Sequence, residues 1–179
     1  MAKEKTVILG LTASIAIYKS CDIIRKLRKE GVQVIAVETA SAEELIRPIV
    51  FQSLTGNKVY RGMFDSPDPW QIEHISLAEK ADLVLVAPAT ANIIGKVASG
   101  ICDDLLTCLI SATTAPVLFC PAMNVNMYKN KITQANIRKL KRSGYKFCAP
   151  VEGALVCGKQ GIGCLAPVDV IVKEVKKYL

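Results

Sequence analysis

The segment Gly10 to Ser14, with the sequence Gly-Leu-Thr-Ala-Ser, joins a short apolar run to a helical pattern. At such a turn, backbone N–H groups and the positive end of the helix attract a phosphate. The hydroxyls of Thr12 and Ser14 could add donors, but the turn lacks the G-x-G-x-x-G pattern of a dinucleotide site. The segment therefore favours a monophosphate ligand; the alternative is that Ser14 only caps the helix.

Two later segments carry polar side chains directly after apolar runs. Residues 87–92, Ala-Pro-Ala-Thr-Ala-Asn, combine small side chains, which let a flat ligand approach the backbone, with Thr90 and Asn92 at a helix start. Residues 121–128 contain Asn124, whose amide can offer both a donor and an acceptor to a ligand carboxylate. The structural alternatives are that Thr90 is a helix cap and that Asn124 serves the turn.

Two residue types suited to proton transfer stand apart from these turns. His74, the single histidine, begins a short helical segment and could act as a base or orient a carboxylate, or have no chemical role. Cys157 lies in a glycine-rich loop over residues 151–166, and its thiol is acidic enough to protonate a carbanion-like centre. The loop is either a lid or an ordinary connection. A metal site is not expected, because no C-x-x-C pair accompanies the lone histidine.

Strands that alternate with helices predict a doubly wound α/β fold with a mostly parallel sheet and helices on both faces. Ligands bind outside the carboxyl ends of such strands, where the polar turns described above occur. Six strands are expected, at residues 7–11, 32–37, 58–61, 82–87, 116–120 and 145–148. Helices are expected at residues 17–28, 48–54, 90–98, 103–111, 133–142 and 168–179.

The composition sets the class of protein. The 179 residues predict a single domain, 1–179, and 51% hydrophobic residues with only 6% aromatic ones favour buried parallel strands over disorder. No apolar run is long enough to cross a membrane. Seven scattered cysteines, an odd number, predict a reducing compartment and a cytoplasmic location. The net charge of +7 suits an anionic partner, but nucleic acid is not expected, because no basic stripe is interleaved with aromatics.

Several of these segments, taken in order, carry a resemblance that covers nearly the whole chain. The chain resembles the flavin-dependent cysteine decarboxylases, most closely their coenzyme A branch. The segments that carry the resemblance are Thr12-Ala13-Ser14-Ile15-Ala16-Ile17-Tyr18-Lys19, Glu73-His74-Ile75-Ser76-Leu77, Ala87-Pro88-Ala89-Thr90-Ala91-Asn92, Gly100-Ile101-Cys102-Asp103-Asp104-Leu105-Leu106-Thr107, Pro121-Ala122-Met123-Asn124-Val125-Asn126-Met127-Tyr128 and the Cys157-Gly158 loop.

The resemblance implies a Rossmann-like fold, bound FMN without metal, and a homotrimer with the flavin near a subunit interface. Ser14 would bind the FMN phosphate, and the catalytic residues would be His74, Asn124 and Cys157. The remaining FMN contacts would be Ala13, Thr39, Thr90, Ala91, Asn92 and Ala122. Substrate would be held by Asn124 at its carboxylate, and by Met127 and Lys159.

The implied activity is decarboxylation of 4'-phosphopantothenoyl-L-cysteine to 4'-phosphopantetheine in coenzyme A biosynthesis. The thiol-bearing carbon would be oxidised transiently by the flavin, which creates an electron sink for the departing carbon dioxide. Cys157 would supply the proton as hydride returns. Lys159 and Cys164-Leu165 depart from the family pattern, in which an acidic residue and an Arg-Met pair are common. The alternatives are a peptidyl-cysteine decarboxylase, which would release an enethiol, and a non-catalytic regulatory flavoprotein.

Overall fold

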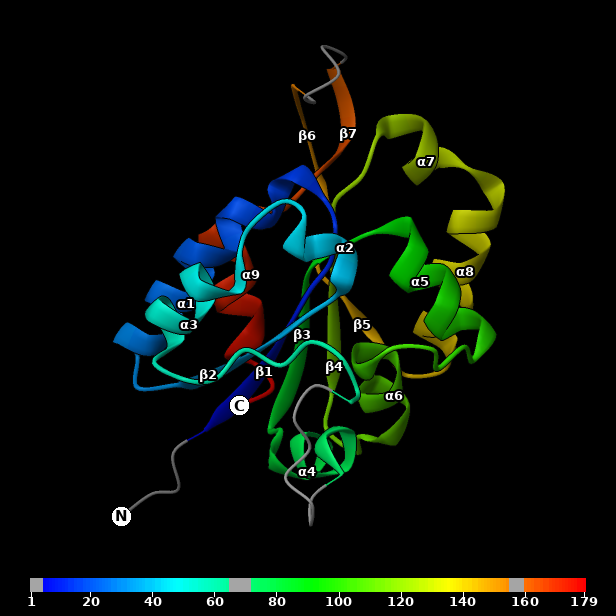
Figure 1. Cartoon of the computed structure of the whole chain (residues 1–179). Coiled ribbons are helices and arrows are strands. Elements are labelled where there is room, and N and C mark those ends of the chain that lie inside the picture. Colours follow the sequence, from blue (N-terminus) through cyan, green and yellow to red (C-terminus); the bar gives the residue numbers. More distant parts are fainter. Residues whose placement is uncertain (1–4, 65–71, 155–159) are drawn as a thin grey trace.

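A central parallel sheet with helices on both faces forms the body of the protein (Figure 1). The computed structural model describes residues 5–64, 72–154 and 160–179. The sheet has the strand order β2-β1-β3-β4-β5, with all neighbouring strands parallel. Its strands are β1 (Thr6–Leu11), β2 (Gln33–Glu38), β3 (Leu83–Ala89), β4 (Val117–Pro121) and β5 (Lys146–Phe147). The predicted doubly wound α/β class is confirmed.

Each face of the sheet is covered by its own set of helices (Figure 1). Helices α1 (Ser20–Lys29), α3 (Pro48–Thr55) and α9 (Val168–Val175) cover one face. Helices α4 (Glu73–Lys80), α5 (Ala91–Ser99), α6 (Leu105–Ala112) and α8 (Lys131–Arg142) cover the other. Three shorter helices complete the described part, namely the 3₁₀ helix η1 (Ile15–Lys19), α2 (Ala40–Glu43) and α7 (Val125–Lys129).

Burial on both faces explains why the strands are nearly continuous apolar runs. In β1, Val7 and Leu9 belong to the core under α1 and α9, whereas Ile8 between them belongs to the core under α5 and α6. All seven residues of β3 are buried. None of the described helices has the length and apolar character needed to cross a membrane.

The predicted strand at residues 58–61 is wrong, so the parallel sheet has five strands rather than six. Only Tyr60 pairs with β2, through the Glu38 N–H to its carbonyl at 2.8 Å and its own N–H to the Ala36 carbonyl at 2.9 Å. Further back along this edge, the Asn57 side chain donates to the Val34 carbonyl at 2.9 Å. Because a side chain takes this edge position, the ladder is limited to one residue.

The glycine-rich segment predicted as a loop contains a second, two-stranded sheet. β6 (Val151–Ala154) and β7 (Gln160–Cys164) pair antiparallel as a ribbon above the carboxyl edge of the main sheet (Figure 1). The segment lacks the apolar alternation of a strand, and Gly161 and Gly163 have φ of +157° and +149°. Backbone pairing therefore holds this ribbon together, and a side-chain pattern could not reveal it.

Candidate active site

The strand order locates the candidate site between β1 and β3. The chain passes from β1 to β2 on one side, and β3 lies on the other side of β1, so the connections after these strands diverge. A crevice forms outside the carboxyl ends at such a switch point. The turns that the sequence singled out, after β1 and after β3, meet there.

Thr12 ties these two turns together. Its buried hydroxyl donates to the Pro88 carbonyl at 2.8 Å and accepts the Thr90 N–H at 3.2 Å. Thr12 was expected to donate to a phosphate, but its hydroxyl is used within the protein, in the bonds to Pro88 and Thr90. Thr12 is therefore a positioning residue, and Ser14 remains the hydroxyl of this turn that is suited to a ligand.

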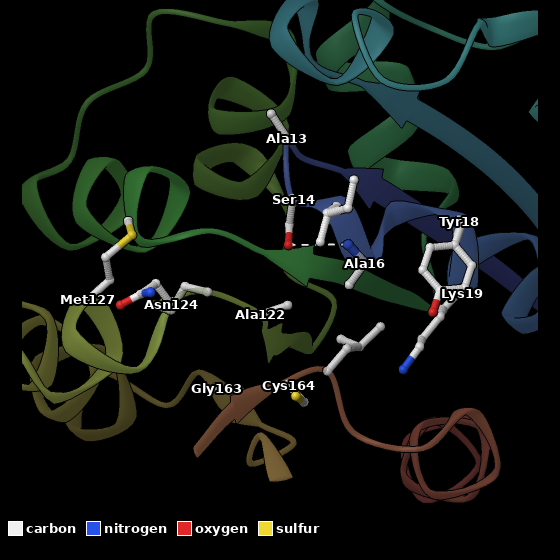
Figure 2. Close-up of a pocket in the computed structure, with 13 residues that line it drawn as sticks. Ala13, Ser14, Ala16, Tyr18, Lys19, Ala122, Asn124, Met127, Gly163 and Cys164 are labelled. Carbon is white, nitrogen blue, oxygen red and sulfur yellow. Dashed lines mark hydrogen bonds between the residues drawn. The ribbon is translucent and has the colours of Figure 1, made fainter. Parts of the chain in front are cut away.

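Ser14 is the N-cap of η1, with extended backbone (φ −122°, ψ 144°). Its Oγ accepts the Ala16 N–H at 3.5 Å, the dashed line in Figure 2, which is near the limit for a hydrogen bond. The capping role that was left open in the sequence is thus present, but weak. Such a hydroxyl can turn to a stronger acceptor at little cost.

A cavity of about 530 Å³, within the usual size of ligand sites, opens beside this turn (Figure 2). It is enclosed by the turn and η1 after β1, by the segment after β4, and by β7 with the residue that follows it. The lining residues are Ala13, Ser14, Ile15, Ala16, Tyr18, Lys19, Ala122, Met123, Asn124, Met127, Gly163, Cys164 and Leu165. Five predicted site residues are therefore brought together, namely Ala13, Ser14, Ala122, Asn124 and Met127.

Asn124 lies at one end of the cavity near Met127, whereas Tyr18 and Lys19 lie at the other end (Figure 2). Its Oδ1 accepts the Asn126 N–H at 2.8 Å and so caps α7. This bond fixes the orientation of the amide, which can also serve a ligand through its NH₂ group. The turn function and the ligand function, which were alternatives in the sequence, are compatible.

The β6–β7 ribbon is held against this wall by the backbone. The Met123 N–H donates to the Gly163 carbonyl at 3.0 Å, and a Cβ at position 163 would lie 2.3 Å from the Met123 carbonyl oxygen. With φ at +149°, glycine is required there both by its backbone and by this close approach.

Sequence reasoning missed part of the lining, including Tyr18, Lys19 and Cys164. Ala16 and Lys19 are three residues apart in η1, and a 3₁₀ helix, which has three residues per turn, aligns such positions on one face. This spacing was a usable signal for Lys19. No comparable local signal existed for Cys164, which reaches the cavity through the pairing of β6 with β7.

Thr39 lines a second cavity, of about 360 Å³, rather than the first. This second cavity lies at the end of β2 and is lined by Glu38, Thr39, Ala40, Glu43, Arg61, Gly62, Met63, Phe64, Asp103, Asp104, Leu105 and Leu106. The Thr39 N–H donates to the Leu11 carbonyl at 3.1 Å, so Thr39 adjoins the turn that leads to Ser14.

The segment after β3 starts α5 as expected. Thr90 is its N-cap and accepts the Ile93 N–H at 3.3 Å, so the predicted capping role is present. Ala91 and Asn92 form the first turn and line neither of the two cavities. Of these three residues, Thr90 is tied to the turn after β1, through the bond from its N–H to Thr12.

One predicted catalytic residue, His74, lies away from the cavity. His74 lies in α4, which packs against α6 at the end of the sheet opposite the carboxyl edge, at the bottom of Figure 1. Within one chain it is therefore separated from Asn124. Cys157 and Lys159 lie outside the described residues.

Among the described residues, no group of three or more His, Cys, Asp or Glu side chains is arranged to hold a metal ion.

One family model and several known proteins match nearly the whole chain. A family model described as "Flavoprotein" matches residues 1–179. The chain is 44% identical over 178 residues to the coenzyme A biosynthesis bifunctional protein CoaBC of Bacillus subtilis; the match takes in 99% of this chain but only 44% of that relative, so the chain spans less than half of its length. It is 41% identical to a "probable phosphopantothenoylcysteine decarboxylase" of Streptococcus mutans, with 98% of this chain and 99% of the relative covered.

A solved structure of similar fold is that of a PPC decarboxylase mutant complexed with pantothenoylaminoethenethiol. The TM-score is 0.87 and the sequence identity 29%, with 98% of both chains covered. The turns of the candidate site thus occur in a chain whose whole length matches one family model, and this protein belongs to the flavoprotein family.

Proposed function

We propose that this protein is an FMN-dependent carboxy-lyase that converts 4'-phosphopantothenoyl-L-cysteine to 4'-phosphopantetheine in coenzyme A biosynthesis. The observation that carries the proposal is the first cavity, which joins the Ser14 turn to Asn124. Membership of the flavoprotein family and the identity to phosphopantothenoylcysteine decarboxylase sequences support it.

The residues present fit a flavin mononucleotide. The strand order β2-β1-β3-β4-β5 is the flavodoxin-like order, in which FMN binds at the β1/β3 switch point. The turn at Ser14 suits the single phosphate, and the small side chains of Ala13 and Ala122 let the ligand lie close to the backbone. Further contacts would come from Thr39, Thr90, Ala91 and Asn92.

FMN, when bound, would take up the hydride from the cysteine moiety and return it later, which makes the decarboxylation possible. The protein's own groups would bind and orient the substrate. Asn124 would donate its amide N–H to the substrate carboxylate, with Met127 packed beside it. Lys159 would hold substrate, and the Cys157 thiol would give up the proton that completes the product.

Lys19 at the far end of the cavity adds a cation that suits a phosphorylated substrate. A cavity with an amide at one end and an ammonium at the other fits a ligand that is anionic at both ends. This arrangement favours phosphopantothenoylcysteine over a peptide that ends in cysteine.

We further propose that the protein is a homotrimer whose site is completed by a second copy. Ile15, Tyr18 and Met127 at the cavity are between 49% and 58% exposed, and Ile72 and Ile75 beside His74 are 60% and 42% exposed. Two different apolar surfaces of one chain can pair head to tail, and such contacts generate a closed ring when the rotation between copies closes. His74 of a partner would then reach the cavity.

We also propose a cytoplasmic location. The six described cysteines are free thiols, which supports this location.

The proposed function is tested with the purified protein and 4'-phosphopantothenoylcysteine under anaerobic conditions. We expect a yellow protein that releases FMN on denaturation, stoichiometric carbon dioxide, and 4'-phosphopantetheine identified by mass. An enethiol about two mass units lighter as the end product would indicate the peptidyl-cysteine decarboxylase type of reaction instead. FMN without turnover would indicate a regulatory flavoprotein, and absence of any flavin would reject the proposal.

A further inference from the structure

Glu38, the last residue of β2, is a fully buried acid whose carboxylate oxygens bond to none of the described residues. Its exposure is 0%, and neither carboxylate oxygen has a hydrogen-bond partner among the residues that the structure describes. The neighbouring Arg61 forms an ion pair with Glu43, with Nη1 3.3 Å from Oε1. A buried carboxyl without a partner costs several kcal/mol, so a buried Glu of this kind calls for a ligand or a role.

The charges around Glu38 are mostly negative. Glu43, at the end of α2, and Arg61, after Tyr60, both face Glu38. Asp103 and Asp104 lie across the second cavity, at the start of α6. Lys96 is bonded to both aspartates, at 2.7 Å and 3.1 Å. Burial first, and then the Glu43 carboxylate, raise the pKa of Glu38 to about 7, while Arg61 opposes the shift. The carboxyl is therefore neutral below about pH 7 and charged above it.

The second cavity, which Glu38 helps to line, lies at the end of the strand next to the one that leads to the Ser14 turn. Glu38 pairs with Leu11 across β1 and β2, and neighbouring strands lie about 4.8 Å apart. Leu11 is three residues from Ser14, the proposed phosphate ligand. Thr39, a proposed FMN contact, lines this same cavity. A ligand anchored at the Ser14 turn therefore has Glu38 within reach of its other end.

We propose that Glu38 contacts the ring of the bound flavin and that its charge sets how readily the flavin is reduced. This inference rests on the proposed function. A carboxyl can accept a hydrogen bond from a ring N–H, which gives the unpartnered oxygens a partner. Reduction by two electrons and one proton leaves a negative charge on the ring. An ionised Glu38 beside it disfavours that charge, and a protonated Glu38 does not.

The test is a spectroelectrochemical titration of the FMN-loaded protein between pH 5.5 and 8.5, with dithionite as the reductant. Glu38→Gln keeps the shape and an acceptor oxygen but removes the charge. At pH 8.5 and a fixed potential, we expect the ratio of reduced to oxidised flavin to be about tenfold higher in this variant than in wild type, or ~30 mV. At pH 5.5 the two proteins are expected to agree. The matched control is Glu44→Gln, which removes the same charge from an exposed neighbour and should behave as wild type.

A second variant, Glu38→Met, removes both the charge and the acceptor. We expect it to bind FMN more weakly than Glu38→Gln while showing the same raised potential at pH 8.5. Equal potentials at every pH and equal FMN affinity in wild type and both Glu38 variants would overturn the inference and leave the proposed function intact. A wild-type protein that binds no FMN would overturn both.

Discussion

At the scale of single residues, the candidate site uses the same side chains for backbone capping and for a ligand. Ser14 and Asn124 are both N-caps, at 3.5 Å and 2.8 Å from the amides they accept. Thr12 uses its hydroxyl to join two strand ends. A ligand-binding role for such residues is therefore testable only with substitutions that preserve the cap.

Asn124→Asp is such a substitution, because Asp caps helices as well as Asn does. It places a negative charge at the proposed position of the substrate carboxylate, which costs several kcal/mol. We expect kcat/KM for decarboxylation to fall by about a hundredfold or more, while FMN content and unfolding free energy stay near wild type.

The control for this variant is Asn126→Asp, which adds the same charge two residues further on, at an exposed position of α7. It should retain kcat/KM within about threefold, because exposed charges are screened. If both variants lost activity equally, the loss would come from added negative charge anywhere near the cavity. Asn124 would then not be assigned to the substrate carboxylate.

At the scale of elements, the first cavity depends on the docking of the β6–β7 ribbon. The ribbon makes its backbone contact at Met123 and Gly163, and β7 supplies Gly163 and Cys164 to the lining. The tight turn after β4 and a glycine strand more than thirty residues later therefore act together. Loss of this contact would therefore remove one wall of the cavity.

Gly163→Ala should push the β6–β7 ribbon away from the Met123 backbone. The new Cβ would meet the Met123 carbonyl oxygen at 2.3 Å, so we expect a loss of about 1–3 kcal/mol in unfolding free energy, measured in urea. The Met123 amide should exchange with solvent faster, and turnover should fall.

Gly144→Ala is the matched control, because Gly144 also has a positive φ, +95°, but a Cβ there would meet no atom within 4 Å. It should cost only the backbone strain, about 1 kcal/mol, and leave turnover unchanged. A Gly163→Ala protein no less stable than Gly144→Ala would show that the close approach does not hold the ribbon.

At the scale of the whole molecule, the proposed catalytic role of His74 requires a second copy, because His74 is separated from Asn124 within one chain. The two residues lie toward opposite ends of the sheet in one chain (Figure 1). In the proposed trimer, a second copy would bring its α4 to the cavity.

Subunit complementation tests this arrangement. His74→Asn and Asn124→Asp proteins should each be inactive alone, because each lacks one part of every site. When they are co-expressed in equal amounts, about one quarter of the sites combine an intact Asn124 with an intact partner His74, so about a quarter of wild-type turnover should return. Sedimentation should give a trimer throughout. A mixture as inactive as its components would place both residues in a site formed by a single chain.

The sequence by itself determined the α/β class, the order of most elements and the turns at which polar side chains gather. It did so because these features are local: β1 and β3 are apolar runs buried on both faces, and Thr90 and Ser14 are capping residues in capping positions. Five of the predicted site residues consequently line one cavity.

Only the tertiary structure decided which segments pair and what they enclose. Strand pairing joins residues far apart in sequence, so residues 58–61 could not be distinguished from a strand, nor the β6–β7 ribbon from a loop. The burial of Glu38 depends likewise on α2 and on Arg61 from a distant segment. His74 matched its motif in the sequence, but the fold alone decides that its helix lies away from the cavity of its own chain.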